Sequence, residues 1–379
     1  MKIVHIITGL GDGGAEHTLF KICKYDSKNK HIVISFKKYG KYFLLLNKLG
    51  IEVHCLNANF FSIHKFFFLI KLLQSLKPDI VQTWLVHADF IGSVAARLAG
   101  IKNILWNVRY SNIEIDKSKF TTILIIKILA KLSYILPEII IIVSKKAKKI
   151  YENKGYDKRK LKFIPNGYDL STLKVIKNHK INFQKKLKIK KQIPIIGYVA
   201  RYDPLKDHVN LLNALSLIRS KGKDFFCILV GFNINKNKIL TNEIKKLKLN
   251  NYIRLLRPVN NVSKVMNLLD IHVQSSSSEG FPNVVAEAMA HKTPCVVTNV
   301  GDSSYIVGQT GWIVPPNNSA KLAKAIETAF NEMATKNWNK KCNLARIRIK
   351  LKFSLSKMIK SYNNIWIKVY RKNDKKPYF

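Results

Sequence analysis

The sequence predicts an α/β protein made of two doubly wound domains that face each other across a central cleft. Short β-rich runs alternate with longer helical patterns in both halves of the chain, which is typical of parallel sheets with crossover helices. The chain has 379 residues, which is long for a single core. A lysine-rich stretch without clear periodicity, residues 171–192, interrupts the alternation and predicts a linker between the domains.

The first half opens with a strand at 2–7, followed by a glycine loop at 9–14. Pro78 ends a long helical pattern at 63–76, because proline is poorly tolerated inside a helix. The other apolar runs predict strands at 32–36, 52–56, 80–84, 103–106, 139–143 and 162–164, and helices at 15–24, 42–49, 87–99, 121–135 and 145–153. We therefore expect one parallel sheet with intervening helices.

The second half repeats this alternation. Strands are expected at 195–200, 225–230, 252–256, 271–274, 294–298 and 312–314, and helices at 209–218, 238–248, 262–268, 282–290, 319–330 and 355–370. The last helix is basic and aromatic. In such sheets, ligands bind at the carboxyl ends of the strands.

The charge of the chain is unusual. There are 66 Lys and Arg against 23 Asp and Glu, which gives a net charge of +43. Such a surface attracts polyanions such as nucleic acid, anionic lipid or phosphorylated substrates. The basic residues are nearly all lysines spread over the whole length, so a compositional drift explains them equally well. Without a clustered basic stripe interleaved with aromatics, a nucleic-acid-binding protein is the less favoured class.

The five cysteines are scattered and lack C-x-x-C spacing, which indicates a reducing, cytoplasmic compartment and no zinc site. The first residues read as a strand and not as a signal peptide. Every apolar stretch is interrupted before about 20 residues, so we expect no transmembrane helix.

Two carboxylates, Glu279 and Glu287, lie eight residues apart around a turn that leads into a helix. Pro282 suits the first helical position, which would leave the amides of Asn283 and Val284 free to face an anion. Glu287 lies in a helix that is apolar nearly all round, so its charge needs a partner such as ligand hydroxyls. Glu279 also fits as an acid favoured by the helix dipole.

The glycine loop fits G-x-G-x-x-G between a strand and a helix, the context of a phosphate site. A dinucleotide site is disfavoured because the second strand ends in Lys37 and Lys38, where an acid would bind the ribose. In the second half, Arg201 and Lys206 follow a buried strand and are placed to bind a diphosphate. Arg109 follows a short strand and could reach an anionic ligand or form a surface salt bridge.

Together these motifs resemble those of the retaining GT-B glycosyltransferases of glycosyltransferase family 4, along nearly the whole chain. The matching segments, in order, are Gly13-Gly14-Ala15-Glu16, Pro78-Asp79-Ile80-Val81 ahead of His87, Ile164-Pro165-Asn166-Gly167, the pair Arg201 and Lys206, and the E-x7-E pattern of Glu279 and Glu287. Asp207 departs from the pattern, because the family often has glycine there.

The resemblance implies a role for each matched position. Arg201 and Lys206 would bind the nucleotide diphosphate in place of a divalent metal, so no metal and no cofactor are expected. Glu287 would bind the ribose. Glu279 would hold the transferred sugar and its phosphate, and His87 would lie near the sugar or the reacting carbon. The implied catalytic residues are His87, Glu279, Arg201 and Lys206, and the implied donor contacts come from Gly13, Gly14, Arg201, Lys206, Glu279, Gly280, Phe281, Asn283, Val284 and Glu287.

The resemblance also implies the architecture and the reaction. Residues 1–176 would form a Rossmann-like acceptor-side domain, onto which a C-terminal helix at about 355–379 packs back, and residues 177–354 a Rossmann-like nucleotide-sugar domain. The expected activity is retaining, metal-independent transfer of a sugar from a nucleotide-sugar, with a UDP-sugar favoured over a GDP-sugar, to a lipid-linked or cell-envelope saccharide. A GT-B epimerase or phosphorylase is the alternative.

Two apolar stretches, residues 62–77 and 119–136, carry lysines at intervals. They could place a basic amphipathic face on the anionic cytoplasmic surface of a membrane and so reach a polyprenyl-diphosphate-linked acceptor. Ordinary buried helices with snorkelling lysines explain the same pattern.

Overall fold

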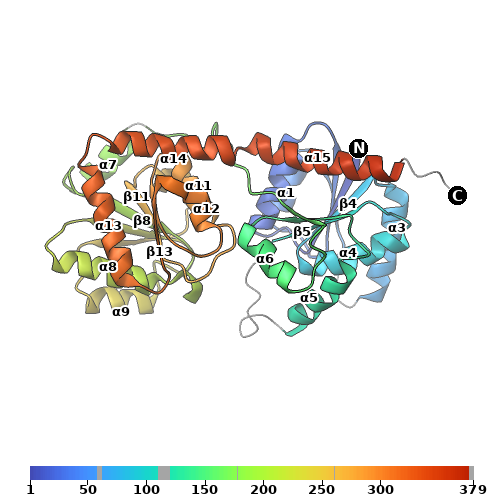
Figure 1. Cartoon of the computed structure of the whole chain (residues 1–379), viewed down its shortest axis with the longest axis horizontal. Helices are drawn as coiled ribbons and strands as arrows, with labels where there is room; N and C mark the ends of the chain where they lie inside the picture. Colours follow the sequence, from blue (N-terminus) through green and yellow to red (C-terminus); the bar gives the residue numbers. More distant parts are fainter. Residues whose placement is uncertain (58–61, 110–119, 177, 260, 375–379) are drawn as a thin grey trace. The chain divides into compact units, whose positions relative to one another are not determined.

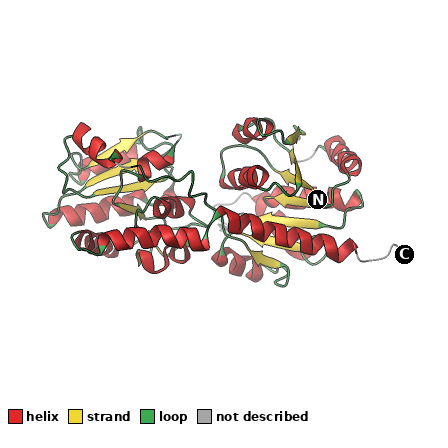
Figure 2. Ribbon diagram, turned by 90° about the horizontal axis from the view of Figure 1, so that it is seen from above, coloured by secondary structure: helices red, strands yellow, loops and turns green. Residues whose placement is uncertain are grey.

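The computed structural model describes residues 1–57, 62–109, 120–176, 178–259 and 261–374, which form two compact units (Figure 1). The first unit consists of Met1–Gly167 and Leu355–Phe379, and the second of Tyr168–Ser354. In each unit, helices cover both faces of a parallel sheet (Figure 2). The predicted fold class, α/β with two doubly wound sheets, is confirmed.

The sheet of the first unit has seven parallel strands in the order β3-β2-β1-β4-β5-β6-β7. The strands are β1 (Lys2–Ile7), β2 (Lys30–Ser35), β3 (Glu52–Cys55), β4 (Ile80–Trp84), β5 (Ile104–Val108), β6 (Ile139–Ile142) and β7 (Leu161–Phe163). Strand β1 pairs with both β2 and β4, so the strand order reverses there. A reversal of this kind opens a crevice at the carboxyl edge of the sheet.

Two sets of helices cover this sheet. One face packs on α3 (Ile63–Leu76), α4 (Val86–Leu98), α5 (Phe120–Leu132) and α6 (Lys145–Asn153). The other packs on α1 (Gly14–Tyr25), α2 (Lys41–Asn47) and the C-terminal α15 (Leu355–Asp374). Helix α15 buries Tyr362 and Trp366 against the sheet, and Trp366 Nε1 donates to Gln82 Oε1 at 2.7 Å.

The sheet of the second unit has six parallel strands in the order β10-β9-β8-β11-β12-β13. They are β8 (Ile195–Val199), β9 (Phe226–Val230), β10 (Ile253–Leu256), β11 (Ile271–Gln274), β12 (Cys295–Thr298) and β13 (Trp312–Val314). Here the order reverses between β8 and β11, which places the crevice of this sheet at their carboxyl ends.

The helices of the second unit share one core with these strands or pack on one another. Helices α8 (His208–Ser220), α9 (Lys238–Lys246) and α13 (Ser319–Met333) share a core with the strands. Helix α11 (Asn283–Ala290) contacts β11 and β12, and packs on α12 (Ser303–Val307) and α14 (Trp338–Lys352). The short α7 (His179–Lys186) and α10 (Val262–Met266) complete the unit.

Every predicted strand is present within two residues of its predicted bounds. The expectation of a linker at 171–192 is wrong for part of that stretch, because α7 lies inside it. This helix is held to the second unit by an ion pair between Lys180 and Asp270 and by packing of Phe183 on Phe226. Helices α12 and α14 were not predicted, since their sequences lack a clear apolar period.

Among the residues described, none of the helices combines the length and the apolar character needed to cross a bilayer.

Candidate active site

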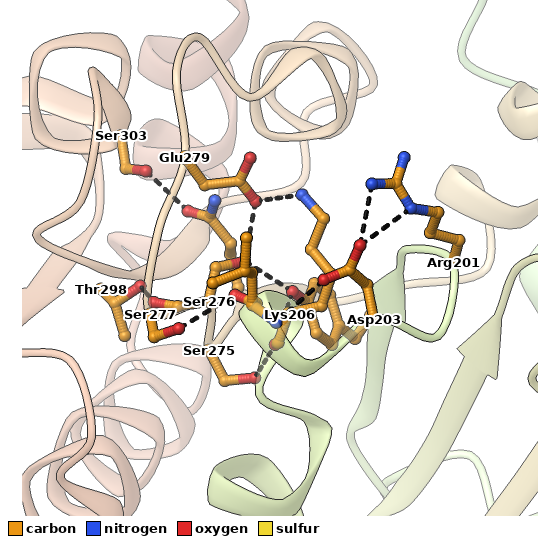
Figure 3. Close-up of polar contacts among 12 residues, drawn as sticks. Arg201, Asp203, Lys206, Ser275, Ser276, Ser277, Glu279, Thr298 and Ser303 are labelled. Atoms are coloured by element: carbon orange, nitrogen blue, oxygen red, sulfur yellow. Dashed lines mark hydrogen bonds and ion pairs between the residues drawn. The ribbon is translucent and has the colours of Figure 1, made fainter. Parts of the chain in front are cut away.

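The crevice of the second sheet brings Lys206 and Glu279 together. Lys206 ends a short 3-10 helix, η2 (Pro204–Lys206), which follows β8, and Glu279 lies in the loop after the neighbouring β11. Lys206 Nζ donates to Glu279 Oε1 at 2.6 Å (Figure 3). Ser276 Oγ donates to the same oxygen at 2.7 Å. The lysine and the first carboxylate of the E-x7-E pattern therefore form a charge-assisted pair.

The buried Tyr198 contacts the backbone of Lys206 and a hydrogen-bond partner of Glu279. The hydroxyl of Tyr198, on β8, lies 2.9 Å from the carbonyl oxygen of Lys206 and 2.8 Å from Ser276 Oγ. Burial, together with the nearby charge of Glu279, raises the pKa of the Tyr198 phenol well above its usual value. The neutral phenol thus ties the backbone of Lys206 to the serine that bonds Glu279.

Arg201 is paired as well, but at the surface. Its Nη2 donates to Asp203 Oδ2 at 2.8 Å, and Asp203 Oδ1 accepts from the amide of Leu205 at the start of η2 (Figure 3). The Arg201 side chain is 65% exposed, whereas that of Lys206 is 21% exposed. Both cations expected to bind a diphosphate are therefore held by carboxylates in this structure, and a polyanion would have to compete for them.

The backbone conformation at Asp207 explains the glycine that the glycosyltransferase pattern often has at this position. Its backbone has φ 47°, in the left-handed region that favours glycine and tolerates Asp or Asn. It is also the N-cap of α8, where its side chain accepts from the amide of Asn210 at 3.1 Å. The aspartate keeps the turn and adds a cap to the helix.

The turn before α11 differs slightly from the prediction. Pro282 is the N-cap, with φ −73° and ψ 99°, and the helix begins at Asn283, so the expectation of Pro282 as the first helical residue is wrong by one position. Most of the helix is buried, but Glu287 and Val284 lie three residues apart on its half-buried side. The Glu287 carboxylate therefore lies on the side of α11 that keeps access to solvent.

The loop residues between Glu279 and α11 are fixed by backbone and ring contacts. The carbonyl of Gly280 accepts from the amide of Asp302 at 2.8 Å. Phe281 is buried and packs on the ring of Phe353, with ring centroids 5.9 Å apart. Asn283 Oδ1 accepts from the hydroxyl of Tyr168 at 2.6 Å.

In the first unit, the glycine loop leads directly into α1. Gly13 is the N-cap, and a Cβ atom there would lie 2.4 Å from Glu16 Oε2. The glycine thus makes room for the Glu16 carboxylate at the start of the helix, where the dipole favours an acid. Burial raises the pKa of Glu16. Gly14 starts the helix, and its carbonyl accepts from Thr18 Oγ1 at 2.9 Å.

His87 lies at the same edge of this sheet, as the second residue of α4, because its strand β4 neighbours β1. The turn that places it is unusual. Leu85, the N-cap of α4, has φ 74° and ψ 151°, a conformation that costs a bulky side chain energy. The predicted glycine-loop and histidine residues of the first unit thus come from neighbouring strands.

Among the residues that the structure describes, Arg109 forms side-chain hydrogen bonds with neutral partners. It donates to Asn107 Oδ1 at 2.9 Å, to Thr18 Oγ1 at 3.2 Å, to Asn166 Oδ1 at 2.5 Å and to the hydroxyl of Tyr362 at 3.1 Å. These partners lie on β5, on α1, in the Pro165-Asn166-Gly167 turn and on α15. The arginine therefore ties four segments together, among them α1, which follows the glycine loop, and no local sequence signal reveals this role.

His5, Cys23 and His31 bring metal-ligand atoms within 4.8 Å of one another in the buried interior of the first unit. The indole N–H of Trp84 donates to His5 Nδ1 at 3.2 Å, so the proton of His5 is on Nε2, 3.0 Å from His31 Nδ1. His31 Nε2 then donates to Asp26 Oδ2 at 3.1 Å. Burial lowers the pKa of His5 well below its usual value. These hydrogen bonds occupy both ring nitrogens of His5 and of His31. The group therefore fits a hydrogen-bond relay and does not fit a metal site.

Two family models match the chain, one over each half. Residues 12–172 match the model described as Glycosyltransferase Family 4, and residues 179–343 match that of Glycosyl transferases group 1. Together they span most of the sequence. The chain belongs to the GT-B glycosyltransferases of family 4. As a member of this family, it is a glycosyltransferase that uses a nucleotide-sugar donor.

Named relatives resemble this glycosyltransferase along most of their length. The UDP-Gal:alpha-D-GlcNAc-diphosphoundecaprenol alpha-1,3-galactosyltransferase of Escherichia coli is 25% identical, with 79% of this chain and 78% of the relative covered. The capsular polysaccharide biosynthesis glycosyltransferase CapM of Staphylococcus aureus is 26% identical, with 70% of each chain covered. The crystal structure of Anabaena Alr3699/HepE in complex with UDP has the same fold, with a TM-score of 0.85, 20% identity and coverage of 96% of this chain and 99% of that one.

Proposed function

We propose that this family 4 enzyme transfers a hexose from a UDP-sugar, with retention of the anomeric configuration and without a metal ion, to a lipid-linked saccharide of the cell envelope. The observation that carries the proposal is the pairing of Lys206 with Glu279 at the point where the strand order of the second sheet reverses. Arg201 and the amino end of α11 follow the same two strands. Cations, amides and carboxylates are the groups that a nucleotide-sugar requires.

The diphosphate of the donor would be bound by Lys206 and Arg201. Binding would exchange each carboxylate partner of these cations for a phosphate oxygen, and two fixed cations stabilise the charge that grows on the departing diphosphate. The proposal of a metal-independent reaction rests on this pair of cations. The choice of uridine is supported by the relatives, since the Escherichia coli enzyme is named for UDP-Gal and the Anabaena structure contains UDP.

The carboxylates would hold the donor. Glu287, on the half-buried side of α11, would accept hydrogen bonds from the ribose hydroxyls. Glu279, released by Lys206, would accept from hydroxyls of the transferred sugar, with the amides of Gly280, Phe281 and Asn283 close in sequence. In this arrangement neither glutamate attacks the sugar. We propose that the acceptor hydroxyl attacks the anomeric carbon on the same face of the sugar from which the diphosphate departs. The hydroxyl would give its proton to the leaving phosphate.

In the first unit, the Gly13–Gly14 loop and His87 are the proposed contacts of the sugar and its phosphate. They follow β1 and β4, at the point where the strand order of that sheet reverses.

The acceptor is proposed from the relatives. One is named for a diphosphoundecaprenol-linked acceptor and another for capsular polysaccharide biosynthesis. Both names describe saccharides of the cell envelope. We accordingly place the enzyme in the cytoplasm, at the cytoplasmic face of the membrane. An epimerase would convert the donor without any acceptor, and a phosphorylase would need free phosphate, so product analysis separates the three activities.

The first test is donor binding. UDP-, GDP-, ADP- and dTDP-sugars are compared by thermal shift, with and without EDTA, and a donor at 100 times its dissociation constant should stabilise the protein by about 2.7 kcal/mol. We expect the shift with UDP-sugars alone and no effect of EDTA. Failure of every nucleotide-sugar to stabilise the protein would refute the proposal, and a requirement for a divalent ion would refute its metal-free form.

The second test is turnover. Lys206→Ala and Glu287→Ala should abolish transfer while the proteins stay folded. Lys221→Ala is the matched control, because Lys221 pairs with Glu327 in the same unit but away from these residues in sequence. The anomeric configuration of the product, read by NMR, decides between retention and inversion. Normal turnover in both site variants contradicts the assigned roles.

A further inference from the structure

Helix α3 exposes large apolar side chains. Its inner side buries Leu69 and Leu73 in the core. Its outer side carries Ile63, which is 73% exposed, Phe67, which is 57% exposed, and Phe68. A soluble surface rarely carries several such residues on one helix unless something covers them.

Helix α5 repeats this arrangement on the same face of the sheet. Leu124 and Ile128 are exposed, and Ile135, just after the helix, is 71% exposed. Helix α4 contacts both α3 and α5 (Figure 1), and Arg97 on α4 donates to the carbonyl of Ile135. Among the described helices, α4 therefore lies between the two exposed rows. We call this surface the α3–α5 face, defined by Ile63, Phe67, Phe68, Leu124, Ile128 and Ile135.

The charge of the α3–α5 face has one sign. Lys71 on α3, and Lys127 and Lys131 on α5, are exposed among the apolar residues, and neither helix contains an aspartate or a glutamate. Neighbouring α6 differs, since its Lys148 forms an ion pair with Glu152 one turn later. Exposed aromatic and aliphatic side chains interleaved with lysines, without acids, complement the interface of an anionic bilayer.

A buried helix with snorkelling lysines accounts for the inner side of each helix but not for the outer one. Snorkelling explains lysine stems that lie along an apolar surface, and does not explain phenylalanines that face solvent beyond them. A protein partner would usually meet mixed charge, hydrogen-bond donors and acceptors at its rim. The exposed charged residues of the two rows, by contrast, are lysines alone, set among apolar side chains.

We propose that the α3–α5 face lies on a lipid bilayer with anionic head groups, with its apolar side chains in the interfacial layer and its lysines at the lipid phosphates. The inference rests on the proposed function, because a lipid-linked acceptor stays in the membrane and the enzyme must reach it there. Docking through this face would hold the first unit at the bilayer surface without any membrane-spanning segment.

Flotation of the full chain with vesicles tests the proposal. We expect binding to vesicles with 30% phosphatidylglycerol in phosphatidylcholine, and weak binding to phosphatidylcholine alone. The double variant Phe67→Glu/Ile128→Glu should lower the partition coefficient by roughly tenfold or more, because it removes apolar contact and adds charge of the wrong sign. The matched control is Leu44→Glu/Ile239→Glu, which changes two exposed apolar residues on α2 and α9 and should leave binding unchanged.

The variant Lys71→Gln/Lys127→Gln/Lys131→Gln gives a second test that leaves the apolar residues in place. It should weaken binding to the anionic vesicles and reduce the effect of salt on it. Equal vesicle binding by the wild type and both α3–α5 variants overturns the proposal. So does a change of oligomeric state in Phe67→Glu/Ile128→Glu, since a second copy of the chain would then cover the face. Donor thermal shifts, measured on the same variants, should stay normal, which separates failure of this inference from failure of the proposed activity.

Discussion

A methyl group on Gly301 would lie 2.4 Å from the carbonyl oxygen of Gly280. Gly301 also has φ 50°, in the region that favours glycine. The Gly301→Ala variant should therefore displace the Glu279–Gly280 loop and weaken donor binding by at least about tenfold, together with a stability loss of roughly 1–3 kcal/mol. Isothermal titration with the donor and chemical denaturation measure the two effects.

Gly222→Ala is the control for this prediction. Gly222 has φ 75°, but apart from its own chain neighbours no atom of the described residues lies within 4 Å of the position its Cβ would take. The substitution should cost stability alone and leave donor affinity unchanged. Similar donor affinities in both variants would show that the close approach of Gly301 does not set the loop position.

Tyr198→Phe should loosen the Lys206–Glu279 pair without touching either residue. The change removes one hydrogen bond from the Lys206 carbonyl and one from Ser276 Oγ, which keep Ser275 Oγ and Glu279 as their other partners, so we expect a loss of about 1–2 kcal/mol in stability and a raised KM for the donor. The buried Tyr156 of the first unit gives the control, Tyr156→Phe. If both variants keep the wild-type KM, Tyr198 is only a core residue.

Asp89 should make the stability of the protein depend on pH. It is fully buried on α4, accepts from Thr83 Oγ1 at 2.6 Å, and burial raises its pKa to about 7 from the usual 3.8. The folded protein thus keeps the proton between about pH 4 and pH 7, where the unfolded chain releases it. Its contribution to stability is complete below pH 4 and is lost as the pH rises to 7, by roughly 4 kcal/mol in total.

Asp89→Asn removes this titration and keeps the shape of the side chain. The free-energy difference between the variant and the wild type, from denaturation at pH 4, 6 and 8, should move in favour of the variant as the pH rises. A difference that stays constant over this range would mean that Asp89 is ionised in the folded protein throughout.

At Leu85 we expect a glycine variant to be more stable than an alanine variant, the reverse of the usual order in a helix. At φ 74°, alanine is strained while glycine is not, so Leu85→Gly should be more stable than Leu85→Ala by about 1–2 kcal/mol. At Val94, in the middle of the same helix, alanine should be the more stable by about 1 kcal/mol. Denaturation midpoints of the four variants give the comparison, and an ordinary order at residue 85 would contradict the backbone described for the turn before His87.

Much of the fold around the site could be predicted because the strands are short, continuous apolar runs. The run at 195–199 and that at 271–274 are buried on both faces, and their adjacency agrees with the doubly wound topology. Lys206 and Glu279 lie in the loops after these two strands, so a location at one edge of the sheet could be expected for both. The bond between the two side chains could not, since a sequence gives residue order but no side-chain distances.

Other features depend on contacts between distant segments. Arg109 bonds to residues from 2 to 253 positions away, and no local pattern encodes such a set. Helix α14 was missed because lysine and arginine occupy much of it, and only Ala345 and Ile349 are buried. It forms through packing on α11, and its intrinsic apolar period is too weak to indicate a helix.

The first unit is synthesised in two pieces, because its last helix, α15, follows the whole second unit in the sequence. The ribosome makes the seven strands of this unit early, but the helix that covers Gln82 and Trp84 is made after all of Tyr168–Ser354. Since domains generally fold as units while they are being made, the second unit has its complete sequence available before the first one does. The part of the first sheet that α15 covers, beside α1 and α2, must then stay exposed until Tyr362 and Trp366 emerge from the exit tunnel.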